Sequence, residues 1–318
     1  MTTTIPFIDL APLFLGESDG LQKVAKTLYQ AYSTVGFGLL INHRVPAQVT
    51  SDIFLASENF HALTQEEKMQ IKYHRYLRGY LPLNISTLKN SELGAAKNPN
   101  QSESYFLTSE SSFYDAGKWA ESVFAGKNVW PVQLPDFQRQ VMNYYREMSQ
   151  LSRRLINAFS LALNLPFNYL DPYFTDPNII LRLLYYPPVS TTPSEEVYGS
   201  APHTDYGCIT LLAQDETGGL QVKTKEEEWL DVPCIPDSLV LNTGQMMSVW
   251  SNGRLKASPH RVVTTAKKQR YSVPFFYNCN MDTYVEPLPG MVTTSHPLTV
   301  ESVVYGEHLE KIIRSNYF

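Results

Sequence analysis

Three side chains in the second half of the chain are of types and spacing that suit a metal ion. His203 and Asp205 are separated by one residue in the segment APHTDYG (201–207). In an extended strand residues i and i+2 point to the same side, so the imidazole and the carboxylate are expected to project together. His260, in SPHRVV (258–263), begins a later apolar run and supplies a third ligand. Two histidines and one carboxylate leave octahedral positions open, which suits Fe(II) and dioxygen chemistry.

A second pair of polar residues follows ten residues after His260. Arg270 and Ser272 also share one face of an extended strand. The planar guanidinium binds a carboxylate through two hydrogen bonds, and the serine hydroxyl adds another donor to the same oxygens. The pair therefore suits a dicarboxylate that chelates the metal at one end and is anchored here at the other.

Short strands are predicted around these residues. From Ile179 onward, apolar runs alternate with Gly, Pro, Asn or Asp. The predicted strands cover residues 179–186, 208–214, 219–224, 227–233, 238–244, 260–266 and 270–278. Regular short strands of this kind favour a double-sheet sandwich or barrel.

The first half of the chain is predicted to be mostly helical. Apolar residues at helical spacing, together with helix-start signals, predict helices over 19–34, 46–63, 64–78 and 136–164. Short strands are expected at 5–10 and 36–42, long loops over a few short strands at 79–135, and a last helix over 299–315. Thr64 and Glu67 have the spacing of a capping box.

Composition favours a small-molecule partner. The chain has 318 residues and a net charge of −5, with no basic cluster typical of a nucleic-acid binder. No apolar run is long enough for a membrane span, and no signal peptide is recognised at the N-terminus. The three cysteines, Cys208, Cys234 and Cys279, are far apart, which indicates neither disulfides nor a thiolate zinc site. A cytoplasmic location is expected.

The chemistry-bearing residues also carry a family resemblance. His203-x-Asp205, His260 and Arg270-x-Ser272, in this order, resemble the 2-oxoglutarate-dependent dioxygenases of the isopenicillin N synthase type. The resemblance covers nearly the whole chain through the segments IPFIDL, GFGLLINH, LLYYPP, HTDYGCITLLAQD, GGLQV, LVLNTG, SPHRVV and RYSVPFF.

The resemblance implies a mainly β fold with flanking α-helices and a double-stranded β-helix, or jelly-roll, core. The chain would then be a single domain over residues 1–318. Within it, residues 1–165 would form a mostly helical region, 175–290 the jelly-roll core and 299–315 a C-terminal helix.

The resemblance also implies roles for individual residues. His203, Asp205 and His260 would bind Fe(II), and Arg270 and Ser272 would hold 2-oxoglutarate. Tyr186 matches a position that helps to hold the co-substrate. Two residues before it, plant members commonly have asparagine where this chain has Leu184.

Three further residues match positions that face the substrate: Arg182, Tyr206 and Asn278. Arg182 is four residues from Tyr186 and shares its face in a regular strand. A structural ion pair with a nearby acid is the alternative for Arg182. Tyr206 follows Asp205 directly, so in a continuous strand it is expected to point away from the metal face.

The implied activity is oxidative decarboxylation of 2-oxoglutarate by dioxygen, coupled to hydroxylation or desaturation of a small organic substrate. Two alternatives stay open. One is an oxidative cyclase or ethylene-forming type of oxidase that works without the co-substrate. The other is a catalytically silent jelly roll that binds a metal or a ligand.

Overall fold

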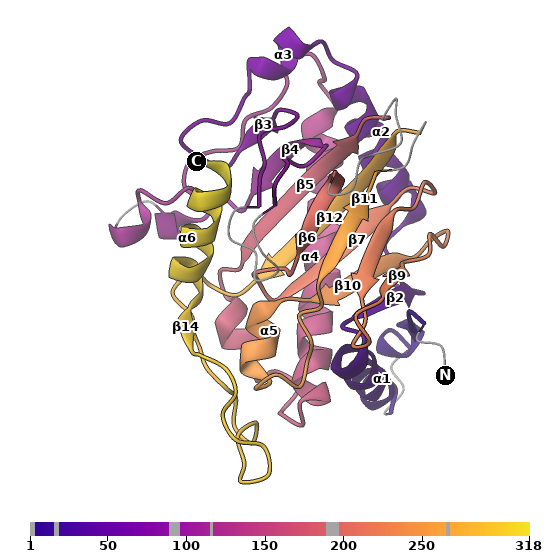
Figure 1. Ribbon diagram of the computed structural model, residues 1–318, viewed down its shortest axis with the longest axis vertical. Helices are drawn as coiled ribbons and strands as arrows, with labels where there is room; N and C mark the ends of the chain where they lie inside the picture. The colour runs from indigo at the N-terminus through magenta and orange to yellow at the C-terminus, as the bar shows by residue number, and fades with distance from the viewer. Residues whose placement is uncertain (1–3, 16–18, 89–95, 115–116, 189–196, 265–267) are drawn as a thin grey trace.

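Two β-sheets face each other, and helices cover the outer face of the larger sheet (Figure 1). The structure is a computed structural model and describes residues 4–15, 19–88, 96–114, 117–188, 197–264 and 268–318. The two facing sheets form the double-stranded β-helix that the sequence predicts.

The larger sheet has eight strands, antiparallel except for the parallel pair at one edge. In spatial order they are β1 (Phe7–Asp9), β2 (Phe37–Ile41), β10 (Leu239–Thr243), β7 (Ile209–Gln214), β12 (Arg270–Asn278), β5 (Asn178–Tyr186), β4 (Glu103–Thr108) and β3 (Gly79–Leu81). The smaller sheet has the order β6 (Tyr198–His203), β11 (His260–Val263), β8 (Leu220–Lys223) and β9 (Trp229–Asp231). A separate pair joins β13 (Tyr284–Val285) to β14 (Val303–Val304).

Three long helices pack on the larger sheet: α1 (Gly20–Thr34), α2 (Ala47–His61) and α4 (Phe137–Ala162). The shorter helices are α3 (Gln65–Met69), α5 (Gln245–Trp250) and α6 (Tyr305–Tyr317), with 3-10 turns η1 (Ala11–Leu13), η2 (Ser112–Tyr114), η3 (Gly117–Trp119) and η4 (Asp171–Phe174). Figure 1 shows α6, in yellow, alongside the β4 and β5 edge of the larger sheet.

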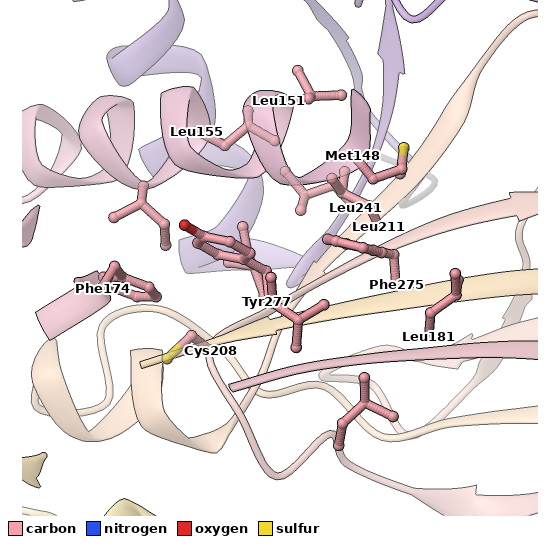
Figure 2. Close-up of a cluster of buried hydrophobic side chains, with 14 of the residues drawn as sticks. Met148, Leu151, Leu155, Phe174, Leu181, Cys208, Leu211, Leu241, Phe275 and Tyr277 are labelled. Atoms are coloured by element: carbon pink, nitrogen blue, oxygen red, sulfur yellow. The ribbon is translucent and has the colours of Figure 1, made fainter. Parts of the chain in front are cut away.

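The outer core lies between the larger sheet and helix α4. Figure 2 shows side chains of the helix above those of the strands, among them Leu151 and Leu155 over Leu211 and Phe275. These four side chains are almost completely buried. Each contributes about 1.5–3 kcal/mol relative to an exposed side chain, so α4 fixes the larger sheet from behind.

A second, smaller core lies between the two sheets. It includes Phe37, Leu184, Leu212 and Val262. Side chains alternate along a strand, so β5 sends Leu183 to the helix side and Leu184 to the inner side. The polar residues on the inner faces therefore meet in the space between the sheets.

Most predicted elements are confirmed, and two of the predicted helices are clearly shorter than expected. The helix predicted over 64–78 ends at Met69, although the capping box of Thr64 and Glu67 is present. The chain turns because Tyr73 and Tyr80 hydrogen-bond through their backbones, and this pairing outweighs local helix preference. The C-terminal helix begins at Tyr305 rather than at 299, since residues 303–304 pair with β13.

One continuous outer core contains residues of both the helical region and the jelly roll, for example Leu28, Leu155 and Phe275. This supports the single domain, which stays a prediction. All three cysteines are free. Among the described residues, no helix is both long and apolar enough to cross a membrane. The cytoplasmic location also stays a prediction.

Candidate metal centre and adjoining pockets

The structure brings His203, Asp205 and His260 together between the two sheets. The two histidines face each other across β6 and β11, with ring centroids 4.3 Å apart. Asp205 Oδ1 lies 3.8 Å from His203 Nε2 and 3.7 Å from His260 Nε2. Such distances are too long for hydrogen bonds and fit atoms that share one metal ion. In the described part of the chain this is the one cluster of potential metal ligands found.

Each ligand is oriented by a neighbour. His203 Nδ1 lies 2.8 Å from the carbonyl oxygen of Ala201, and His260 Nδ1 lies 3.1 Å from that of Ser258. A carbonyl only accepts, so each Nδ1 carries the proton and each Nε2 offers its lone pair to a metal.

Asp205 is held in the same way. Its Oδ2 accepts hydrogen bonds from Thr210 Oγ1 at 2.5 Å and from Asn242 Nδ2 at 2.6 Å, so Oδ1 is directed at the two imidazoles. The donor set fits Fe(II): two neutral imidazoles and one carboxylate, each with one free ligand atom.

Electrostatics keep His203 and Asp205 in their metal-binding protonation states. Burial, and then the neighbouring His260, lower the pKa of His203 to about 4. Burial alone would raise the pKa of Asp205, but the two histidines and the bonds from Thr210 and Asn242 lower it. At neutral pH His203 is therefore neutral and Asp205 ionised, as metal ligation requires.

The strand predicted through Asp205 is wrong in one respect, because β6 ends at His203. The chain then turns toward α5, where Gln245 N donates to the carbonyl of Asp205 and Met246 N to that of Gly207. The carboxylate still reaches the histidines, but from a turn rather than from a pleat.

Arg270 and Ser272 lie on the inner face of β12, close to Tyr186. Arg270 is 2% exposed. Its Nε donates to the carbonyl of Gly218 at 2.8 Å, its Nη1 lies 3.1 Å from Ser272 Oγ, and its guanidinium lies 4.8 Å from the centre of the Tyr186 ring. The group is thus fixed in orientation while charged donors still face the space between the sheets.

Two adjoining cavities meet at His203, Asp205 and His260, which we call the triad. The first, about 80 Å³, contains Arg270, Ser272 and Tyr186 together with the three potential ligands. The second, about 90 Å³, lies on the α6 side and contains Arg182, Tyr206 and Asn278. Both are bounded by His203, Asp205 and Arg182. We call them the clamp cavity and the substrate cavity.

Arg182 lies on the inner side of β5 and joins the two cavities. Its Nη2 donates to Ser104 Oγ at 3.0 Å and its Nη1 to Tyr317 Oη at 3.3 Å, while Phe106 lies under the guanidinium at 4.3 Å. Within the described ranges, no carboxylate forms an ion pair with Arg182, so the alternative of a structural ion pair finds no support there.

Tyr206 and Asn278 reach the substrate cavity by different means. Strand alternation does not apply to Tyr206, because β6 has already ended at His203. Tyr206 therefore faces the cavity rather than away from it. Its hydroxyl accepts from Asn316 Nδ2 at 3.4 Å. Asn278 Oδ1 accepts the backbone N–H of Cys208 at 2.9 Å, which leaves its NH₂ group for the cavity.

Several residues of the site escaped the sequence analysis: Thr210, Asn242, Ser104, Phe106 and Tyr317. Thr210 and Asn242 are polar residues within apolar strands, and this was a usable signal because buried polar groups need partners. Ser104, Phe106 and Tyr317 gave no such signal, since only the tertiary fold brings β4 and the end of α6 to β5.

Known proteins resemble this chain in sequence and in fold. Residues 177–278 match the model of the 2OG-Fe(II) oxygenase superfamily, and residues 5–133 match that of the "non-haem dioxygenase in morphine synthesis N-terminal" family. A homoarginine-6-hydroxylase of Glycine max is 32% identical over 99% of this chain and 98% of its own length. A 2-oxoglutarate-Fe(II) type oxidoreductase of Emericella nidulans is 30% identical over 99% and 93%.

A solved structure shows the same architecture. A full-length Neurospora crassa protein, in complex with alpha-KG and thymine, superposes with a TM-score of 0.85 at 28% identity and covers 98% of this chain and 97% of its own. The present chain belongs to the 2OG-Fe(II) oxygenase superfamily. It is a 2-oxoglutarate-dependent dioxygenase, with Fe(II), 2-oxoglutarate and dioxygen as its cofactor and co-substrates.

Proposed function

We propose that His203, Asp205 and His260 hold the catalytic Fe(II) of this dioxygenase. The observation that carries the assignment is the convergence of one free ligand atom from each residue, with every other polar atom of the three side chains already bonded. The bound iron supplies the redox chemistry by which dioxygen oxidises 2-oxoglutarate to succinate and carbon dioxide and then oxidises the substrate. The three residues fix the position of that chemistry.

We further propose that Arg270 and Ser272 bind the far carboxylate of 2-oxoglutarate, with Tyr186 against the guanidinium. The clamp cavity runs from these residues to the triad. A guanidinium and a hydroxyl are matched donors for a carboxylate, and burial strengthens the pairing. The intact clamp favours 2-oxoglutarate turnover over the co-substrate-independent oxidase and over the silent jelly roll.

On the other side, we propose that Arg182, Tyr206 and Asn278 contact the substrate. All three border the substrate cavity beside His203 and Asp205. Apolar walls such as Phe276 and Ile180 exclude water there, which protects the reaction from side products. The partner is therefore a small molecule, hydroxylated or desaturated at a carbon that faces the triad.

An anaerobic ligand screen followed by oxygen exposure tests this function. The protein is loaded with Fe(II) and 2-oxoglutarate under nitrogen and mixed with single candidates. These include thymine and L-homoarginine, the compounds named for the Neurospora crassa complex and the Glycine max hydroxylase. After oxygen is admitted, succinate is quantified and product mass is measured. We expect iron-dependent succinate, with a substrate that gains one oxygen atom or loses two hydrogens. Equal succinate with and without iron would contradict the proposal.

A further inference from the structure

Arg182 is a cation in the substrate cavity whose neighbours carry no charge. Its hydrogen-bond partners are the hydroxyls of Ser104 and Tyr317, and the face of Phe106 lies beneath it. Its Nε is buried and has no hydrogen-bond partner. A partly buried cation held only by neutral groups is costly unless a ligand completes the site.

No residue of the described cavity wall supplies the missing negative charge. Asp205 is the only acid among these lining residues. Its Oδ2 is bonded to Thr210 and Asn242, and its Oδ1 faces the two histidines. Asp205 is therefore committed to the metal, and the charge of Arg182 is left for a ligand.

Much of the remaining cavity wall is apolar, and its other polar side chains, such as Asn100, Ser200 and Asn278, are neutral. The apolar part is formed by Phe106, Ile180, Phe276, Leu309 and Ile313. Such walls favour an apolar body and offer no anion to a positively charged one. The ligand that fits is small, apolar over most of its surface and negatively charged at one end.

The last turn of α6 fixes the orientation of Arg182. Tyr317 is held from behind by Tyr73, whose hydroxyl donates to its carbonyl at 2.9 Å, and its ring packs edge-on against Phe106 at 5.8 Å. Its hydroxyl is thereby kept beside Arg182 Nη1. Because Nη1 and Nη2 are both tethered, the guanidinium plane is preorganised before a ligand arrives.

We propose that the substrate of this enzyme is a small carboxylate with an apolar body. Its carboxylate pairs with Arg182, and Tyr317 is the positioning residue that aims the guanidinium. The inference rests on the proposed function, since the rest of the substrate must face the triad. It makes the C-terminal turn of α6 a determinant of specificity.

The test uses three probes of one shape and different charge: benzoate, benzamide and benzamidinium. Their binding to the full chain, loaded with Fe(II) and 2-oxoglutarate under nitrogen, is measured by titration calorimetry. The loaded co-substrate prevents benzoate from using Arg270. Benzoate should bind at least about tenfold tighter than benzamide, which is the effect of one charge-assisted hydrogen bond. Benzamidinium should bind weakest.

Variants then separate recognition from general damage. Arg182→Leu should remove the preference for benzoate over benzamide, and Arg182→Lys should retain part of it. Tyr317→Phe should reduce the preference about fivefold, the effect of one neutral hydrogen bond. Tyr284→Phe is the control: its side chain is exposed and does not line the cavity, so the change should leave the preference unchanged. Circular dichroism melting checks that each variant is folded.

The outcomes distinguish this inference from the proposed function. A wild-type chain that prefers benzamide, or a preference that survives in folded Arg182→Leu, would overturn the carboxylate assignment. An equal loss in the Tyr317→Phe and Tyr284→Phe variants would overturn the positioning role. A chain that prefers benzoate through Arg182 but shows no iron-dependent succinate would support this inference and refute the proposed function alone.

Discussion

The clamp cavity and the substrate cavity share the triad but are built differently. The clamp residues Arg270 and Ser272 come from one strand, ten and twelve residues after His260, and Arg270 is fixed partly by a backbone carbonyl. The groups around Arg182 come from β4 and from the end of α6, far away in sequence, and its bonds go to side chains alone. The proposed co-substrate side is thus local in sequence and anchored by a backbone carbonyl, whereas the proposed substrate side depends on tertiary packing.

The largest effect on turnover is expected from substitutions in the triad, where both cavities meet. His203→Ala, Asp205→Ala or His260→Ala removes one of three ligands, so each variant should lose measurable turnover and most of its iron affinity. Iron binding is measured by anaerobic equilibrium dialysis and turnover by succinate formation. His296→Ala is the control, since His296 lies outside the cluster and contacts the carbonyl of Asn252. Full activity in any ligand variant would remove that residue from the set.

The hydrogen bonds of Glu103 at the start of strand β4 can be tested through their effect on stability. Glu103 begins β4 and accepts hydrogen bonds from Lys68 at 2.8 Å, from His61 and from Tyr80. Glu103→Gln leaves the buried ammonium of Lys68 without its counter-ion and should cost about 3 kcal/mol of unfolding free energy. Chemical denaturation measures it. Glu307→Gln, in an exposed pair with Lys118, should change stability by less than about 0.5 kcal/mol.

The same cluster predicts a pH dependence. Burial raises the pKa of Glu103, but the bonds from His61, Lys68 and Tyr80 outweigh it and lower the pKa from 4.5 to about 2. A pKa lower in the folded state stabilises the fold above the unfolded value, and this contribution is lost as pH falls from about 4.5 toward 2. Melting temperatures should fall more steeply in this range for the wild type than for Glu103→Gln. Parallel curves would contradict the assignment.

On the clamp side, Arg270→Lys keeps the charge but loses the planar fork. The 2-oxoglutarate concentration for half-maximal rate should rise about tenfold to a hundredfold, the effect of about 1–3 kcal/mol. The KM of the organic substrate should change little. Arg261→Lys is the control, because Arg261 contacts Gln221 and Trp229 away from both cavities. A co-substrate dependence that stays at the wild-type value would place the clamp elsewhere.

The smallest expected effect concerns the residues that orient Asp205. Thr210→Val removes one of the two donors to Oδ2 and should weaken iron binding roughly tenfold. Thr243→Val is a matched control, since the Thr243 hydroxyl donates to the carbonyl of Lys256 instead. Equal iron affinities in the two variants would show that the bond from Thr210 does not orient the ligand.

The contrast between the cavities also explains what the sequence could predict. Strand β12 was predicted with its observed bounds, 270–278, because its apolar and aromatic run is bounded by clear turn signals. The shared face of Arg270 and Ser272 was predictable from their i and i+2 spacing in a strand, whereas Asp205 approaches the histidines from a turn that this spacing does not encode. The early end of α3 was not predictable, because the backbone pairs Tyr73 with Tyr80 soon after Met69. The link between Arg182 and Tyr317 has no pattern in the sequence, since only packing joins residues so far apart.

Release of carbon dioxide from 2-oxoglutarate labelled at its first carbon tests the central claim most directly. We expect release by the wild-type chain that requires both Fe(II) and dioxygen and falls to background in His260→Ala. Iron-saturated wild-type protein that releases no label with any substrate of the screen would contradict it, as would equal release by His260→Ala.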